Sequence, residues 1–317
     1  MCFKEKNVKL SEIDADDHSY RITTQETVDD LMDSIGHVGV LNLPLLLEKK
    51  SRCIILSGFR RIEACRRLDR PDVNARILDS DTKKLECARY AITDNAFQRP
   101  LNLIEKSRSI RMLSNCFSDP RRLSREISIL GVPCHESMIP KIKDICSFSK
   151  PLQNSILSES ISLPVALELH KMSKDVEDGF VELFSVLKLS VNKQREILML
   201  IQEISLREDI PMVEILEGLH LKRILNDEDL DKNQKIRKIR SHLKQRRFPA
   251  ITRAERGFEE HRQNLKLGAG IKLIPPDNFE SPTYFLNFSF KDLKELKHLK
   301  KIFDALIKNP SLKKILD

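Results

Sequence analysis

The sequence predicts an α+β protein with three parts: a small α+β domain, an all-helical domain and a small α+β tail. The N-terminal third alternates short apolar runs with segments whose apolar residues repeat at helical spacing. The middle third shows the helical spacing alone, and the tail adds two strand-like runs around a Pro-Pro-Asp-Asn turn. A chain of 317 residues fits two or three ordinary domains. We expect domains at 1–117, 118–225 and 226–317.

Composition and charge indicate a cytoplasmic protein. No window approaches the ~20 uninterrupted apolar residues of a membrane span, and the opening MCFKEKNVKL lacks the apolar core of a signal peptide. The seven cysteines form no Cys-x-x-Cys pair, so we interpret them as small buried residues in a reducing compartment. They occupy positions 2, 53, 65, 87, 116, 134 and 146. The net charge of +8 agrees with a polyanionic partner and equally with plain solubility.

Helices and strands alternate through the first domain. Helices are predicted over Thr27–Ile35, from near Phe59, and over Thr82–Ile92, and strands over Leu41–Leu47, Cys53–Leu56 and Val73–Leu78. Gly36 and Gly39 are expected to end the first helix. His37, between these two glycines, is then expected in a loop.

The stretch Cys53–Leu68, CIILSGFRRIEACRRL, has the pattern of an anion-binding turn. Gly58 frees the backbone at the end of a strand, and Arg60 and Arg61 fall in the first turn of a helix. The amides of that turn have no partners within the helix, and the positive end of the helix dipole favours a phosphate. The pattern alone leaves open that both arginines are merely solvated.

This stretch resembles the Gly-Glu-Arg-Arg box of the ParB/sulfiredoxin-like fold. Ser34-Ile35, Gly39-Val40-Leu41 and Pro44-Leu45 resemble the family's preceding box, and DNAFQRPLNLIE at 94–105 resembles its Glu-Asn box and the segment that follows. The resemblance covers Asp29 to about Leu113 and continues more faintly to about Leu198. Sulfiredoxin chemistry is not supported, because Ser57 and Phe59, and no cysteine, flank the glycine of the turn.

The resemblance implies that CTP and magnesium bind at these boxes. The residues it assigns to the nucleotide are Gly58, Arg60, Arg61, Asn95, Gln98 and Arg99. It assigns magnesium to Asp94 and Asn95, whose oxygens are hard ligands. Three positions depart from the family: Phe59 and Asp94 replace glutamates, and Gln98 replaces an arginine that is displaced to Arg99. We therefore expect weak CTP hydrolysis at most. A turn that ends a helix is the alternative interpretation of Asp94-Asn95.

The middle domain carries a candidate DNA-binding module. A capping-box-like Asn102 to Glu105 opens a helix, and basic residues crowd the interval from Lys106 to Arg125. Leu123–Gly131 and Ser137–Cys146 have the pattern of a helix-turn-helix, with Pro140 shortening the second helix. We expect DNA contacts from Arg121, Arg122, Arg125, Ser137, Lys141 and Lys143. Solvated helix faces are the competing interpretation. In a later segment that resembles the family, Val165 and Leu167 replace its histidine and arginine.

The tail begins with a basic helix. Lys232–Arg247 holds eight lysines or arginines and no acid, and its apolar residues form a single stripe. We expect Arg237, Lys238 and Arg240 to contact nucleic acid, although an extended linker has similar composition. Strands are predicted at Ile271–Ile274 and Tyr284–Phe290, and a helix at Leu293–Ile315. The aromatic side of the second strand is expected to pack on that helix. Stacking on single-stranded bases, or pairing of two subunits, are the alternatives.

The function predicted from the resemblance is that of a DNA-binding ParB-like protein, either a plasmid or chromosome partition factor or a related transcriptional regulator. Double-stranded DNA, a second copy of the chain and a partition ATPase are the expected partners, with the protein on the nucleoid in the cytoplasm. The alternative is a nucleotide-hydrolysing or nuclease enzyme of the same fold. No residue is assigned as catalytic, because no general base is evident near the boxes. A scaffold that has lost its ligand is a third hypothesis, which Phe59 favours.

Overall fold

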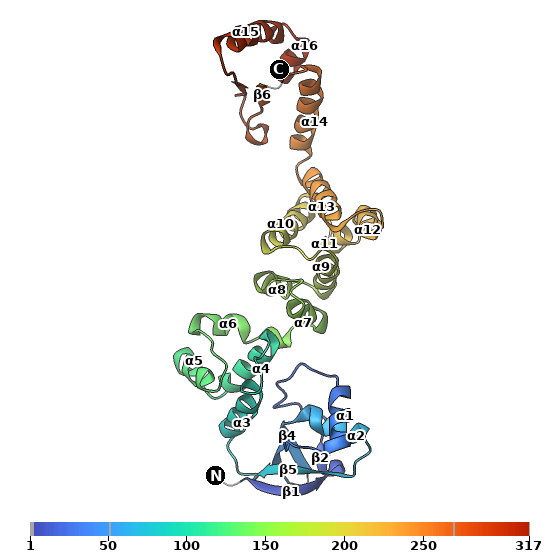
Figure 1. Cartoon of the computed structure of the whole chain (residues 1–317), viewed down its shortest axis with the longest axis vertical. Helices are drawn as coiled ribbons and strands as arrows, with labels where there is room; N and C mark the ends of the chain where they lie inside the picture. Colours follow the sequence, from blue (N-terminus) through green and yellow to red (C-terminus); the bar gives the residue numbers. More distant parts are fainter. Residues whose placement is uncertain (1–2, 51, 269, 317) are drawn as a thin grey trace. The chain divides into compact units, whose positions relative to one another are not determined.

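The computed structural model describes residues 3–50, 52–268 and 270–316, and Cys2 lies outside them. The chain forms two compact units, Met1–Lys188 and Leu189–Asp317 (Figure 1). This division does not test the three predicted domains, whose boundaries at 117 and 225 stay predictions. Within the described residues, no helix has both the length and the apolar composition needed to cross a bilayer.

A five-stranded mixed sheet organises the first unit, in the order β1-β5-β3-β4-β2. The strands are β1 (Lys4–Lys9), β2 (Ile13–Asp14), β3 (Leu45–Lys49), β4 (Arg52–Ser57) and β5 (Asp72–Leu78). In the middle of the sheet, β3 pairs antiparallel with β4 and parallel with β5. The sequence did not predict the two outer strands, because β1 buries only Val8 and β2 has two residues.

Helices cover both faces of this sheet. On one face α1 (Asp29–Val38) and α2 (Phe59–Arg67) bury Ile35 and Ile62 against Leu46 and Ile55 of the strands (Figure 1). On the other, α3 (Lys84–Ala96) contributes the buried Cys87. The α+β prediction for the N-terminal part is confirmed.

Two local predictions, for His37 and for the cysteines, and one alternative interpretation, for Asp94, were wrong. Helix α1 continues through Gly36, so His37 is helical and contacts the carbonyl of Asp33 at 2.8 Å; the helix ends at Gly39, whose φ is 78°. Helix α3 extends to Ala96, so Asp94 lies in its last turns and not in a turn that ends it. Cysteines are not uniformly buried, because Cys116 is exposed.

Helices make up the rest of the first unit. They are α4 (Leu103–Ser114), α5 (Pro120–Ile129), α6 (Ile139–Ile142), α7 (Lys150–Leu157), α8 (Leu163–Leu169) and α9 (Lys174–Leu187). The predicted capping box at Asn102 and Glu105 is confirmed. The predicted helix Ser137–Cys146 is wrong. It breaks into the 3-10 turns Glu136–Met138 and Ile145–Ser147 on either side of the one-turn α6. Pro140, which cannot donate to a preceding turn, sits at the start of α6.

The second unit begins with helices and ends in a small α+β subdomain. Its elements are α10 (Val191–Glu208), α11 (Met212–Leu216), α12 (Leu219–Asn226), α13 (Lys232–Arg247), α14 (Pro249–Asn264), β6 (Ile271–Ile274), a 3-10 turn (Asp277–Phe279), β7 (Phe285–Phe288), α15 (Leu293–Ile307) and α16 (Pro310–Leu316). Pro310 divides the helix predicted as one. The Phe288 ring meets that of Phe303 edge-on at 5.7 Å, which confirms aromatic packing between β7 and α15. Phe285 nevertheless stays 59% exposed.

Candidate functional site

The junction of β4 and α2 forms the base of a cavity of about 300 Å³. Gly58 caps α2 with a φ of 95°, and a Cβ at this position would lie 2.7 Å from the Cβ of Pro44. Only glycine fits this approach without a shift of the backbone. The first amides of α2 have no partners within the helix, so this end of the cavity favours an anion. The cavity is lined by Ile22, Thr23, Gln25, Leu31, Ser34, Ile35, Gly39, Val40, Leu41, Asn42, Ser57, Gly58, Phe59, Arg60, Arg61, Asn95, Gln98 and Arg99.

Arg61 is part of the cavity wall. Its guanidinium donates to the carbonyls of Asn42 at 2.5 Å and Leu43 at 3.3 Å, and it lies 3.7 Å from the carboxylate of Asp94. The side chain is 17% exposed. Burial lowers the pKa of Arg61, and the charge of Asp94 opposes that effect. A cation held this firmly is preorganised for an anionic ligand and costs little ordering entropy on binding.

Arg60 bonds instead to the loop before α1 and to the first turn of α1. Its guanidinium donates to the carbonyl of Thr27 at 2.9 Å, to the amide oxygen of Gln25 at 2.9 Å and to Asp30 at 2.7 Å. These bonds use three of the five N–H donors of the guanidinium that the sequence assigned to a phosphate. The Asp30 carboxylate is 66% exposed, so this ion pair contributes little and can exchange for a better acceptor.

The two residues predicted to hold magnesium differ in position. The Ser57 hydroxyl donates to the carboxylate of Asp94, which lies beside the cavity and not among its lining residues. Asn95 lines the cavity, and its amide nitrogen donates to Ala91 of the same helix at 2.8 Å. In the described part of the chain, no group of three or more His, Cys, Asp or Glu side chains could hold a metal ion. A magnesium ion here would therefore depend on phosphate oxygens for most of its ligands.

Glu105 fixes the far wall of the cavity, a role that the sequence did not reveal. Arg99 donates two bonds of 2.7 Å to its carboxylate, which also accepts from the amides of Thr24 at 2.9 Å and Asn102 at 3.1 Å. Burial alone would raise the pKa of Glu105, but these donors lower it. The capping pattern located this glutamate, but its partner Thr24 is distant in sequence and gave no signal.

The predicted DNA contacts of the first unit lie on an exposed surface. Arg121 and Arg122, in the first turn of α5, are 83% and 82% exposed and form only long ion pairs, at 3.4 Å to Glu136 and 3.9 Å to Asp119. Arg125 and Lys141 are exposed as well, and Lys143 is half-buried. The amide of Ser137 donates to the His135 ring. These cations are available for phosphate contacts.

Helix α13 is attached to α10 by ion pairs. Arg240 donates to Glu196 at 2.8 and 3.1 Å, and Lys244 lies 3.1 Å from the same carboxylate. Burial raises the pKa of Glu196, but these two cations lower it below its usual value. Of the three contacts predicted on this helix, only Arg237 and Lys238 are exposed without a recorded partner among the described residues. Arg240 is held by the carboxylate of Glu196.

These features define a mixed-sheet domain with an arginine-lined cavity at a strand-to-helix junction. Residues 4–96 match the family of the ParB N-terminal domain. The chain is 26% identical over 220 residues to the probable chromosome-partitioning protein ParB of Campylobacter jejuni, covering 69% of this chain and 76% of the relative. It is 22% identical over 177 residues to the protein of that name from Helicobacter pylori, covering 56% and 59%. It thus spans less than two thirds of the latter. The chain is therefore similar to ParB proteins, and the family match itself covers residues 4–96.

Solved structures of ParB proteins are similar at a lower level. The C-terminally truncated ParB of Caulobacter crescentus complexed with CTP-gamma-S has a TM-score of 0.27 and 18% identity, covering 57% of this chain and 98% of that one. A pNOB8-like ParB N-domain has a TM-score of 0.37 and 15% identity, covering 77% and 96%. Values this low carry no argument about function, and the assignment depends on the sequence matches.

Proposed function

We propose that this chain is a DNA-binding partition protein of the ParB-like family whose N-terminal cavity binds CTP. The observation that carries the proposal is the cavity at Gly58, where an open helix start, a half-buried Arg61 and the polar side chains of Asn95 and Gln98 meet. A triphosphate needs several cationic or amide donors in a confined site. The relatives that the chain matches are named as chromosome-partitioning proteins, which supports the DNA partner.

The residues present fit the phosphates better than they fit the metal. Gly58 leaves room for close backbone approach, and Arg61 needs no rearrangement to face an anion. Arg60 must leave Asp30 to contact a phosphate, which exchanges an exposed ion pair for a charge-assisted bond. Magnesium, when bound with the nucleotide, would neutralise phosphate charge near Asn95 and Asp94. Asp94 must then loosen its contacts with Ser57 and Arg61.

DNA binding is proposed for α5 and the broken second helix. The exposed arginines of α5 provide phosphate contacts, and Lys141 and Lys143 lie on the segment that would face base edges. Arg237 and Lys238 of α13 add affinity that does not depend on sequence. A partition ATPase is the further partner that the proposed role requires, and the nucleoid is the expected location.

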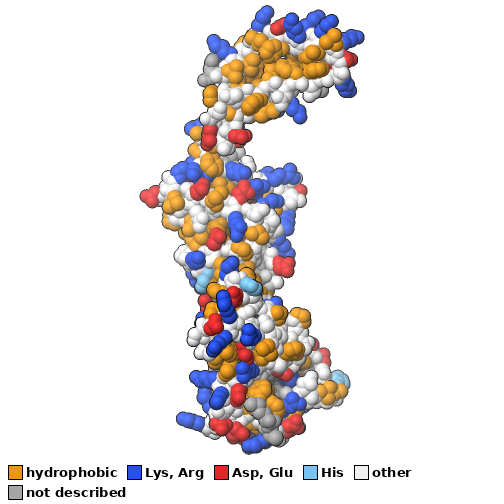
Figure 2. Space-filling view, turned by 90° about the vertical axis from the view of Figure 1, so that its left-hand side faces the viewer, with side chains coloured by type: hydrophobic (Ala, Val, Ile, Leu, Met, Phe, Trp, Pro, Cys, Tyr) orange, Lys and Arg blue, Asp and Glu red, His pale blue; other side chains and the backbone are white. Residues whose placement is uncertain are grey.

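A homodimer is proposed through the C-terminal subdomain. An apolar cavity of about 530 Å³ is lined there by Phe288, Phe290, Leu296, Leu299 and Phe303, with Lys297 and Lys300. Hydrophobic side chains gather over these elements in Figure 2. Phe285 and Leu293 are 59% and 66% exposed, and β7 has a free edge in its two-stranded sheet. A second copy would cover both the apolar surface and the strand edge.

Calorimetry with each of the four ribonucleoside triphosphates and magnesium tests the nucleotide. CTP is expected to give heat beyond any that all four triphosphates share, and Arg60→Ala should abolish this CTP-specific heat. Folded protein that gives no heat with any triphosphate would contradict the proposal. Sequencing the DNA recovered with the protein from cells tests the rest: one palindromic site is expected for a partition factor, scattered promoters would indicate a regulator, and no enrichment would contradict DNA binding.

A further inference from the structure

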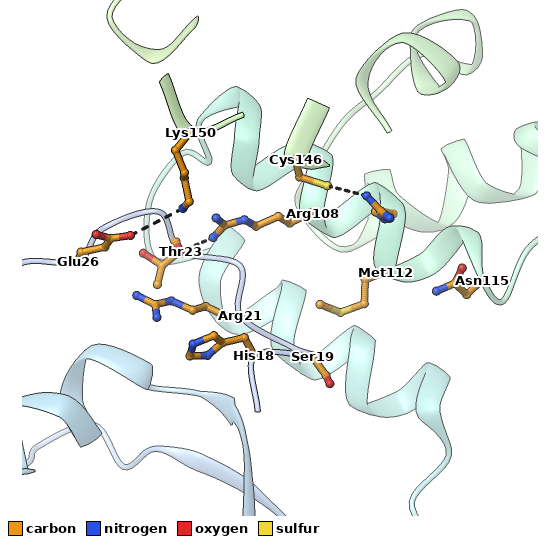
Figure 3. Close-up of a pocket in the computed structure, with 11 residues that line it drawn as sticks. His18, Ser19, Arg21, Thr23, Glu26, Arg108, Met112, Asn115, Cys146 and Lys150 are labelled. Carbon is orange, nitrogen blue, oxygen red and sulfur yellow. Dashed lines mark hydrogen bonds and ion pairs between the residues drawn. The ribbon is translucent and has the colours of Figure 1, made fainter. Parts of the chain in front are cut away.

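A second cavity, of about 540 Å³, lies in the first unit between the loop before α1, helix α4 and the start of α7 (Figure 3). It is larger than the cavity at Gly58 and lies outside the family's boxes. Its lining residues are His18, Ser19, Arg21, Thr23, Glu26, Arg108, Arg111, Met112, Asn115, Cys146 and Lys150.

The cavity has four cationic side chains and one carboxylate. The carboxylate, Glu26, is 3.8 Å from the ammonium of Lys150, and both groups are largely exposed. Arg111 has only a weak contact of 3.9 Å with the sulfur of Cys146. Among the described residues, the guanidinium of Arg21 has no hydrogen bond or ion pair, and it lies 5.9 Å from the centre of the Phe59 ring. The positive charge is therefore largely uncompensated.

Two of these cations lie close enough to repel one another. Arg108 donates to the backbone carbonyls of Ile22 at 3.0 Å and Thr23 at 2.6 Å, which fixes its guanidinium beside the loop that carries Arg21 (Figure 3). Burial lowers the pKa of Arg108, and the charge of Arg21 lowers it further. An anion between the two guanidinium groups would replace this repulsion with two attractive contacts.

We propose that this cavity binds a small molecule that carries a diphosphate or triphosphate group, at a site separate from the Gly58 cavity. Phosphate is favoured over a single carboxylate because Arg21, Arg108 and Arg111 offer several forks of donors, which match its multiple oxygens. A small molecule is favoured over a DNA backbone because the site is concave and of the volume usual for small-ligand pockets.

The two cavities have one lining residue in common. Thr23 lines both of them. The guanidinium of Arg108 donates to the Thr23 carbonyl, and that of Arg99 lies 3.4 Å from the Thr23 hydroxyl. Any test must therefore separate binding at the two sites. Variants of Arg21 and Arg111 do so, because neither side chain lines the Gly58 cavity.

The test is calorimetry of the full chain with inorganic pyrophosphate in magnesium-free buffer. Arg21→Gln and Arg111→Gln should each weaken pyrophosphate binding roughly tenfold, the usual loss for one charged hydrogen bond. The double variant should abolish pyrophosphate binding at this cavity. Arg52→Gln, an exposed strand residue that lines neither cavity, is the matched control and should bind like the parent. Arg60→Gln should affect only a step that arises at the Gly58 cavity. Circular dichroism melting confirms that each variant is folded.

Two outcomes would overturn this proposal. Parent protein that gives no pyrophosphate heat, or a double variant that binds pyrophosphate like the parent, shows that the cavity is not a phosphate site. A short DNA duplex that displaces pyrophosphate, and itself binds the double variant more weakly, would assign the cavity to backbone phosphates instead. CTP binding measured on the same variants reports separately on the function proposed above.

Discussion

Replacing Gly58 with alanine should damage both the fold and the nucleotide site. The residue has a φ of 95°, a conformation that costs an L-residue roughly 1–2 kcal/mol. The added Cβ would also lie 2.7 Å from the Cβ and 2.9 Å from the Cα of Pro44. Forced overpacking of this kind costs about 1–3 kcal/mol. The two effects together predict a loss of about 2–5 kcal/mol in the free energy of unfolding.

Denaturant unfolding of the full chain measures that loss, and Gly36→Ala is its matched control. Gly36 lies within α1, and a Cβ there would meet nothing within 4 Å. Alanine at this position should stabilise the helix by about 0.5–1 kcal/mol. Gly58→Ala should also lose CTP binding, because the contact with Pro44 displaces the start of α2. A Gly58→Ala protein as stable as the parent would refute the reasoning from backbone conformation and contact.

Three further predictions concern other parts of the chain. Glu105→Gln should cost about 3 kcal/mol of stability, since it breaks a buried charge pair. The folded pKa of Glu105 is below its ordinary 4.5, so the stability that its carboxylate contributes should be present above that pH and be lost on further acidification. Melting temperatures measured against pH would show this loss. Arg237→Gln with Lys238→Gln should weaken binding to all duplexes alike and reduce the salt slope by about 1.8, as anisotropy titrations at several salt concentrations would show; an unchanged slope would exclude these contacts. Replacing Lys141 and Lys143 should reduce discrimination between a selected site and random DNA in competition assays, and undiminished discrimination would assign specificity elsewhere.

Elements with strong local signals could be predicted from the sequence. The basic helix is observed at Lys232–Arg247 and the first tail strand at Ile271–Ile274, each with the predicted bounds. Capping and turn residues flank them, Asp231 before the helix and Gly270 and Pro275 around the strand, and such residues act within a few positions. The outer strand β1 gave no such signal, because it exists only through pairing with β5, more than sixty residues away. Long-range pairing of this kind is absent from local patterns.

The candidate site shows the same limit. The sequence located the turn at Gly58, because glycine and a helix start are local features. It did not show that Arg240 pairs with Glu196, 44 positions away, or that the Glu105 carboxylate accepts hydrogen bonds from both Arg99 and Thr24. A run of arginines predicts positive charge but not which charges the fold neutralises. Only the three-dimensional partners separate a cation that is free to bind from one that holds two helices together.

Arg60 and Arg61 are adjacent in sequence and yet have different roles in the fold. Arg61 points to backbone carbonyls, which cannot move without disturbing the strand entry at Asn42 and Leu43, so its position is fixed. Arg60 points to Gln25 and the Thr27 carbonyl of the loop before α1, and to the exposed Asp30 in the first turn of α1, whose pKa it lowers through their hydrogen bond. Because the exposed pair is weak, a ligand phosphate can compete for Arg60 but not displace Arg61. In the proposed site, Arg61 therefore preorganises the cavity. Arg60 instead couples ligand binding in the cavity to the loop before α1, because a phosphate that takes Arg60 releases its bonds there.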